Sequence, residues 1–116
     1  MTDSSWATIA ELERWLSENG PEPAPADRTP AADRTRLLLQ ILKISEEAGE
    51  VAEAVIGAMG QNPRKGFSHS WEDVESELYD VIITSMVALT SLNPDAGTVF
   101  AQHLARVAER AFGPSR

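Results

Sequence analysis

Apolar residues near the start of the chain recur three or four positions apart, as on one face of a helix. They are Trp6, Ile9, Leu12 and Leu16. Gly20 and Pro21 interrupt this pattern, so the sequence predicts a helix from about Ser5 to Asn19. The next stretch, residues 20–32, is rich in proline and predicts an extended linker after this helix.

A second apolar pattern predicts a long helix that starts near Pro30 or Asp33 and ends near Met59. Its expected seam alternates steps of four and three residues: Leu37, Ile41, Ile44, Ala48, Val51, Val55 and Met59. Sustained spacing of this kind is typical of helices that pack in bundles. At 1.5 Å per residue, such a helix would be roughly 40 Å long.

A loop over residues 60–69 precedes a third helix, which we expect to begin after Ser70 as its N-cap and to run to about Leu92. Ser70 with Asp73 three residues later is typical of a capping box. The expected seam of this helix is Val74, Leu78, Val81, Ser85, Ala88 and Leu92. Further apolar residues widen the apolar surface beyond that seam, which indicates a central helix or one at a subunit interface.

A fourth helix is expected from about Pro94 to Phe112, closed by Gly113. No segment has the alternating pattern of a strand. The sequence therefore predicts an all-α fold of four helices in a single domain, residues 1–116. The loop between the second and third helices is short, so these two long central helices should be antiparallel neighbours.

Composition excludes several function classes. The net charge is -8 with only ten Lys and Arg, whereas a binder of duplex nucleic acid needs a dense cationic face. The absence of cysteine excludes thiolate metal sites and cysteine nucleophiles. No apolar stretch reaches the roughly 18 residues of a membrane span, and no secretory signal is recognisable. We therefore expect a cytoplasmic protein that binds neither nucleic acid nor membrane.

Two groups of carboxylates lie within the long helices. The first follows the pattern E-E-x-x-E and comprises Glu46, Glu47 and Glu50. The second follows E-x-x-D and includes Glu77 and Asp80. Because residues on a helix turn by about 100° each, every group occupies one side of its helix. If the two helices face each other here, four or five carboxylates converge.

Carboxylates at such short distances from one another cannot all stay ionised without a compensating charge. Either some become protonated or a divalent cation binds, and oxygen-only ligands suit Mg²⁺ or Mn²⁺. Spacing alone does not decide between such a site and a solvated acidic face. Glu75 points about 200° away from Glu77 and is left out. A di-iron centre would need E-x-x-H pairs, which neither His69 nor His103 provides.

The chain resembles the MazG-like nucleotide pyrophosphohydrolases of the all-α NTP pyrophosphatase superfamily. The resemblance covers about residues 37–92. It rests on the segment from Ser45 to Glu53, on Arg64-Lys65-Gly66 in the loop, and on the segment from Glu77 to Val81. The family has a small or polar residue between the two acids of the third helix, where this chain has Leu78 and Tyr79. That departure touches no ligand position.

The resemblance implies that Glu47, Glu50, Glu77 and Asp80 hold Mg²⁺, with Mn²⁺ as a substitute. It implies that Glu46, together with Glu47, serves catalysis by supporting a second metal or orienting the attacking water. The implied reaction is hydrolysis of a nucleoside triphosphate between the α and β phosphates, as in clearing the nucleotide pool.

Cations must offset the phosphate charge that metal ions do not reach. Lys43 lies four residues before Glu47, while Arg64 and Lys65 lie in the loop, so these three are the expected substrate-binding residues. Solvated roles for them stay open. The family further implies a dimeric four-helix bundle, possibly a dimer of dimers. Two alternatives remain: a phosphoribosyl-nucleotide pyrophosphatase, and a helical interaction module without catalysis.

Overall fold

The computed structural model describes residues 4–20 and 30–113, with side-chain surroundings given for α2 from Arg34 onward. Within these residues the chain forms four helices and no strand. They are α1 (Ser5–Asn19), α2 (Pro30–Met59), α3 (Trp71–Leu92) and α4 (Ala96–Phe112). The predicted all-α class is confirmed. No helix in the described ranges has the length and apolar content needed to cross a membrane.

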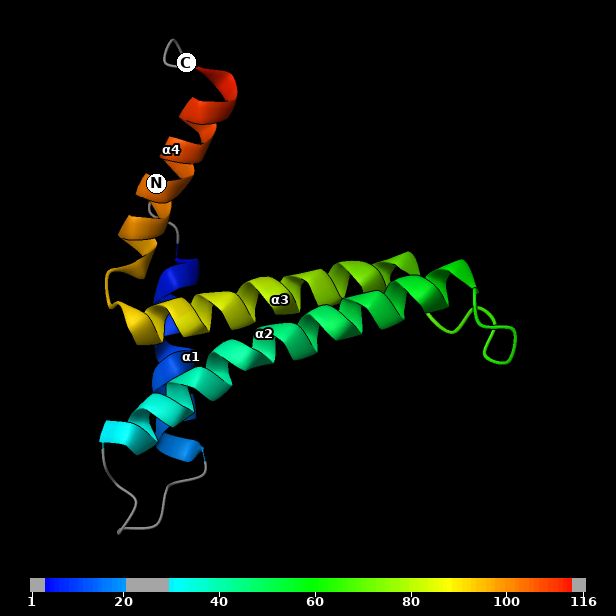
Figure 1. The fold of residues 1–116 in the computed structure, drawn as a ribbon, viewed down its shortest axis with the longest axis horizontal. Coiled ribbons are helices and arrows are strands. Elements are labelled where there is room, and N and C mark those ends of the chain that lie inside the picture. The colour runs from blue at the N-terminus through cyan, green and yellow to red at the C-terminus, as the bar shows by residue number, and fades with distance from the viewer. Residues whose placement is uncertain (1–3, 21–29, 114–116) are drawn as a thin grey trace.

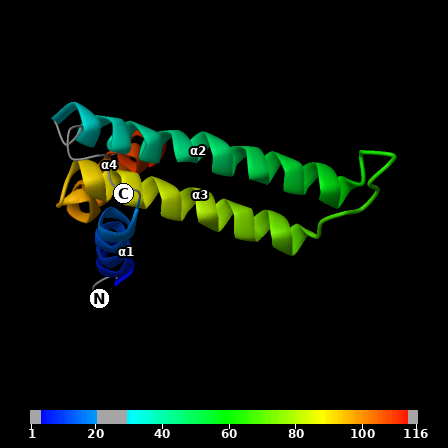
Figure 2. The same ribbon diagram turned by 90° about the horizontal axis from the view of Figure 1, so that it is seen from below.

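Helices α2 and α3 form a long antiparallel hairpin, joined at one end by the loop over residues 60–70 (Figures 1 and 2). Helix α1 packs across the opposite end of the hairpin, mainly against α3. Helix α4 leaves the end of α3 and extends away from the hairpin (Figure 1). The hairpin is therefore the central element of the fold, and it carries both groups of carboxylates.

The predicted boundaries hold with one correction. Helix α4 starts at Ala96, two residues later than expected, because Asn93 is extended and ends α3. Most of the predicted linker, residues 21–29, lies outside the described residues. Gly20 ends α1 as expected, and residues 30–32 are helical because α2 begins at Pro30, the earlier of its two predicted starts. Proline at the first helical position explains this early start, because its missing N–H has no partner there anyway.

The seam between α2 and α3 confirms part of the prediction. The predicted residues that are buried or half-buried are Leu37, Ile44, Val51, Val55, Val74, Val81, Ser85 and Ala88, whereas Ile41, Ala48, Met59, Leu78 and Leu92 are exposed. On α2 the heptad positions of the seam, all buried or half-buried, are Leu37, Gln40, Ile44, Glu47, Val51, Ala54 and Ala58. On α3 they are Val74, Glu77, Val81, Thr84 and Ala88. These positions alternate steps of three and four, so both helices keep a heptad repeat. The small side chains of Ala54 and Ala58 pack against Val74 and let the helices approach closely.

The predicted positions that are exposed belong to a second, apolar face. Ile41, Ala48, Met59 and Leu78 each lie one position after a seam residue, about 100° further round the helix. Met59 is 60% exposed and Leu78 is 48% exposed. Because the two helices are antiparallel, a turn of about 100° on each places the exposed apolar residues of α2 and those of α3 on the same side of the hairpin. The isolated chain thus has one buried seam and, beside it, an uncovered apolar face.

The N-terminus of α3 is fixed by the predicted capping box. Ser70 Oγ accepts a hydrogen bond from the backbone N–H of Asp73 at 3.1 Å, and Asp73 Oδ2 accepts one from the backbone N–H of Ser70 at 2.8 Å. These two bonds satisfy backbone donors that the helix itself leaves unpaired. They also lower the pKa of Asp73 below its usual value. The box therefore sets the residue at which α3 begins, and with it the register of Glu77 against α2.

A small apolar contact holds helix α1 against the start of α4. Ile9 is buried, and the ring of Trp6 lies 5.9 Å from that of Phe100 on α4, tilted by 48°. The indole also packs on Gly97, where an added Cβ would meet ring carbons at 3.0 Å. This contact joins α1 to the start of α4.

Candidate metal centre

Glu47 of α2 and Glu77 of α3 lie in the seam itself, where the heptad repeat would ordinarily carry apolar residues. Asp80 follows one turn after Glu77 on the same helix. One carboxylate oxygen from each of these three residues lies within 4.8 Å of the others. The predicted convergence of the two acidic groups is therefore present, and it occurs across the helix–helix interface.

Glu50 completes the cluster, as its effect on its neighbours indicates. The pKa of Glu77 is raised above its usual value, first by partial burial and then by the carboxyls of Glu50, Asp80 and Glu47. The pKa of Glu47 is raised by partial burial and by Glu50 and Asp80, while Lys43 opposes this rise. Mutual repulsion of this kind favours either protonation or a bound cation.

One further observation indicates that these residues suit a divalent metal ion. Oε2 of Glu77 is buried and has no hydrogen-bond partner among the described residues. A buried polar oxygen without a partner costs free energy that a cation ligand would offset. The donors around it are carboxylate oxygens on rigid helices, which suit Mg²⁺ and Mn²⁺.

Two other acidic residues of the predicted region lie outside this group. Glu46 is exposed at the edge of α2 and is not part of the group of three close oxygens. Glu75 accepts a hydrogen bond from the Tyr79 hydroxyl one turn away, which raises the pKa of that hydroxyl. The prediction that Glu75 points elsewhere is thus confirmed.

The predicted substrate-binding residues are divided between two places. Lys43 is near enough to Glu47 to counteract the rise in its pKa. Lys65 lines a cavity of about 470 Å³ between the loop and α2, whereas Arg64 is not among the residues that line it. The two basic loop residues therefore differ in position although they are neighbours in sequence.

The loop cavity is also lined by residues that were not predicted from the sequence as site residues. Its polar lining includes Asn62, Ser68 and His69, together with Glu53 of α2. The loop can approach α2 only because residue 57 is glycine: a Cβ there would meet His69 Nδ1 at 2.2 Å and Ser68 Oγ at 2.5 Å. A glycine inside an otherwise strong helix was the signal available in the sequence.

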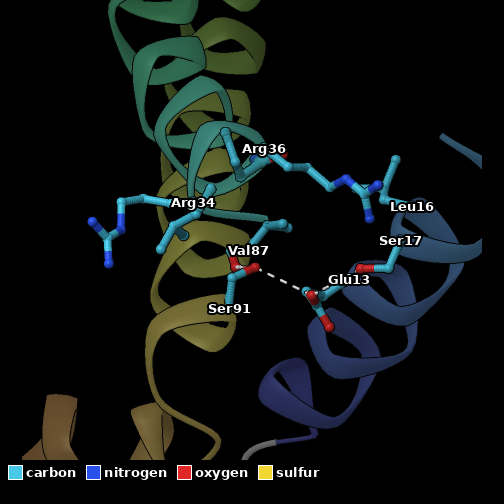
Figure 3. A pocket seen from close by; sticks show the side chains of 9 residues that line it. Glu13, Leu16, Ser17, Arg34, Arg36, Val87 and Ser91 are labelled. Carbon is cyan, nitrogen blue, oxygen red and sulfur yellow. Dashed lines mark hydrogen bonds between the residues drawn. The ribbon is translucent and has the colours of Figure 1, made fainter. Parts of the chain in front are cut away.

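A second cavity, of about 480 Å³, lies between α1, the start of α2 and the end of α3 (Figure 3). Ser17 and Ser91 both donate hydrogen bonds to Oε1 of Glu13 at 3.2 Å, and the bond from Ser91 ties α1 to α3. The guanidinium of Arg36 extends toward α1, while that of Arg34 points away from it. The two arginines therefore do not converge on a common ligand, and this cavity is a joint between helices.

No family model, curated protein or solved structure matches the chain. The chemistry of the carboxylate group and the loop cavity is therefore the basis for assigning a function.

Proposed function

We propose that the protein is a Mg²⁺-dependent nucleoside triphosphate pyrophosphohydrolase that clears unwanted nucleotides from the cytoplasmic pool. Its products would be a nucleoside monophosphate and pyrophosphate. The observation that carries this proposal is the convergence of Glu47, Glu77 and Asp80 across the α2–α3 seam, with one carboxylate oxygen buried and unpartnered. The resemblance to MazG-like pyrophosphohydrolases, which rests on the same residues, supports the choice of substrate.

Glu47, Glu50, Glu77 and Asp80 would hold the metal ion. When bound, Mg²⁺ neutralises triphosphate charge and makes a water molecule easier to deprotonate near neutral pH. Glu46, exposed beside the cluster, is proposed to orient the attacking water and accept its proton. Lys43 and Lys65 supply positive charge along the phosphate chain.

In the reaction, the oxygen of water attacks the α-phosphorus while the bond from that phosphorus to the bridging oxygen breaks. The electron pair leaves with pyrophosphate, and the proton of the water passes to Glu46. Such a transfer depends on positioning and on charge stabilisation, and it needs no covalent nucleophile. Rigid helices that meet in one seam are suited to that kind of positioning.

We further propose that two copies pair through the exposed apolar face of the hairpin to form a MazG-like four-helix bundle. The radius of gyration is 18.2 Å, against about 13 Å for a compact domain of about 100 residues. Leu78, Ile82 and Leu89 line this face on α3 and are 41–54% exposed. Glu50 and Asp80 lie three residues after seam positions, on the opposite side of the hairpin. Pairing would therefore leave the carboxylates open to substrate.

The proposal is tested with a panel of canonical and modified nucleotides, a phosphoribosyl nucleotide among them, in the presence of Mg²⁺. Products are identified by phosphorus NMR or chromatography. We expect monophosphate and pyrophosphate from at least one triphosphate, and their loss in Glu47→Gln but not in the matched control Glu75→Gln. Release of inorganic phosphate, turnover of the phosphoribosyl nucleotide alone, or no turnover at all would overturn the proposal.

A further inference from the structure

Helix α4 carries an apolar stripe that the rest of the described chain leaves exposed. Phe100, Leu104 and Val107 follow steps of four and three residues, which places them on one side of the helix. The start of the stripe meets α1, where the Phe100 ring contacts that of Trp6. Further along, Leu104 is 53% exposed and Val107 is 39% exposed. The helix therefore continues past its contact with α1 as an arm with one apolar side (Figure 1).

A second exposed apolar group lies at the loop end of the hairpin. Met59 ends α2, Trp71 begins α3, and Phe67 lies in the loop between them. Phe67 is 80% exposed and Trp71 is 58% exposed. The Phe67 ring lies against Gly60, where an added Cβ would meet ring carbons at 2.7 Å. This loop-end cluster of Met59, Phe67 and Trp71 is therefore held by the backbone beneath it although it faces solvent.

The loop-end cluster continues the exposed apolar face of the hairpin. Met59 belongs to that face on α2. Trp71 lies seven residues before Leu78, or about two helical turns, and so lies on the same side of α3. A second molecule that covers the apolar face can therefore also reach the cluster.

Charge is divided unevenly between the two ends of the hairpin. Residues 46–80, which include the loop end, carry nine carboxylates and two basic side chains. Residues 34–45 and 81–112, toward the other end, carry five basic side chains and two carboxylates. Helix α1 adds three carboxylates and one arginine there, but it lies on the other side of the hairpin. Its residues line one cavity together with Val87, which is turned about 200° from Leu89 of the apolar face.

The charges of α4 lie beside its apolar stripe. Arg106 and Arg110 are turned to the same side of Val107, by about 100° and 60°. Glu109, the one acidic residue of this helix, is turned by about 200° from Val107 and so points away from the stripe. The surface that α4 offers is therefore apolar with a basic edge, which complements an apolar cluster in acidic surroundings.

We propose that α4 is an arm that docks on a second copy of this chain, with its apolar stripe against the loop-end cluster of that copy. When two hairpins pair antiparallel about a twofold axis, each α4 comes to the loop end of the other copy, and the contact forms twice. The basic end of each copy then meets the acidic end of the other. Parallel pairing would instead bring the two acidic ends together, which is unfavourable. This inference rests on the proposed pairing of two copies, to which it adds an orientation and a second contact.

Cross-linking between copies tests the contact, because the chain has no cysteine of its own. The single variants Leu104→Cys and Phe67→Cys are mixed, allowed to exchange partners and treated with a short bismaleimide. We expect a cross-linked dimer from the mixture and little from either variant alone. Gln102→Cys is the matched control, because residue 102 is exposed and points about 200° away from Leu104. Mixed with Phe67→Cys, it should cross-link at least about 5-fold more slowly, since its side chain is on the far side of α4.

The dissociation constant of the dimer, measured by sedimentation, gives a second readout. Leu104→Ser should raise this constant at least about 10-fold, and Gln102→Ser less than about 2-fold. A variant with both Arg106→Gln and Arg110→Gln should bind its partner more weakly at low salt and depend less on salt than the wild type. Leu104 is exposed in the single copy, so an unchanged circular dichroism spectrum shows that Leu104→Ser keeps the fold.

Three results overturn the inference: a wild type that is monomeric at micromolar concentration, equal cross-linking by Leu104→Cys and Gln102→Cys, or an unchanged dissociation constant in Leu104→Ser. The proposed pairing face fails separately. If Ile82→Glu abolishes the dimer and Leu104→Ser does not weaken it, the pairing of hairpins stands and the α4 contact fails. If Leu104→Ser weakens the dimer and Ile82→Glu does not, the α4 contact stands and the pairing face fails. None of these outcomes depends on hydrolysis of a nucleotide.

Discussion

Glu47 on α2 and Glu77 on α3 bring carboxylate oxygens within 4.8 Å of each other across the hairpin seam. Each occupies a heptad position at which a bundle would gain stability from an apolar side chain. The chain therefore carries electrostatic repulsion at the centre of its main helix–helix contact. Sites that give up stability in this way are commonly functional.

Glu77→Gln should separate the loss of stability caused by carboxylate repulsion from the part that Glu77 plays in metal binding and activity. Removing one charge relieves the repulsion, so the metal-free variant should unfold at a higher temperature than the wild type at neutral pH. The same variant should lose stabilisation by Mg²⁺ and lose activity by at least about 100-fold. Thermal melts with and without Mg²⁺ measure both effects. Glu75→Gln, which removes a charge outside the cluster, should change neither; equal behaviour of the two variants contradicts this reading.

The stability of the metal-free protein should depend on pH with a defined sign. Glu47 and Glu77 have pKa values raised above the usual 4.5, so the folded state binds protons more tightly than the unfolded state. For these two groups, stability is then greatest below about pH 4.5, and it falls as the pH rises through their pKa values in the folded state. Melting in a chelator should thus show higher stability at about pH 5 than at pH 7. Glu77→Gln should flatten this slope.

Gly57 and Gly49 on α2 should respond oppositely to alanine. In Gly57→Ala the new Cβ collides with His69 Nδ1 and Ser68 Oγ, so the loop must move and the protein should lose about 1–3 kcal/mol. An added Cβ at Gly49 meets nothing within 4 Å, so Gly49→Ala should gain about 0.5–1 kcal/mol from helix propensity. Denaturant titrations measure both. A stabilising Gly57→Ala would show that the loop does not rest on α2.

Ser70→Ala should destabilise the protein by about 0.5–2 kcal/mol, because it removes one half of the capping box of α3. Asp73 supplies the other half, and its pKa is lowered by Ser70. Its stabilising effect is therefore present above its usual pKa of 3.8 and is lost as pH falls through the lower folded value. Urea titrations of the wild type and Asp73→Asn at pH 7 and about pH 3 test this. The two should differ less at the lower pH.

The exposed face of the hairpin should determine the oligomeric state. Ile82→Glu introduces a charge on the proposed pairing face and should yield monomers, measured by sedimentation or light scattering. Ile83→Glu is a matched control, because residue 83 is turned about 100° away from that face and is 40% exposed. It should leave the dimer intact. A wild-type protein that is monomeric at micromolar concentration contradicts the pairing.

Local signals in the sequence were sufficient for the helices. Apolar spacing and turn residues predicted the ends of α1, α2 and α3, and the Ser70–Asp73 capping box was recognisable from two residues. These features depend on neighbours within one or two helical turns, so they can be predicted without a tertiary structure. The two clusters of acidic residues could also be predicted, since their spacing alone places each cluster on one side of its helix.

What only the tertiary structure decided was which face of each helix meets the other. The sequence has two apolar stripes on α2 and α3, one position apart, and the predicted seams combined residues of both, such as Ile44 and Val81 from one and Met59 and Leu78 from the other. The hairpin buries the stripe that also contains Ala54, Ala58, Glu47 and Glu77. Small residues permit close helix approach there, and that gain in packing outweighs the burial of larger side chains on the other stripe. The contact of His69 with Gly57 was likewise invisible in sequence, because it depends on how a loop folds back across a helix twelve residues away.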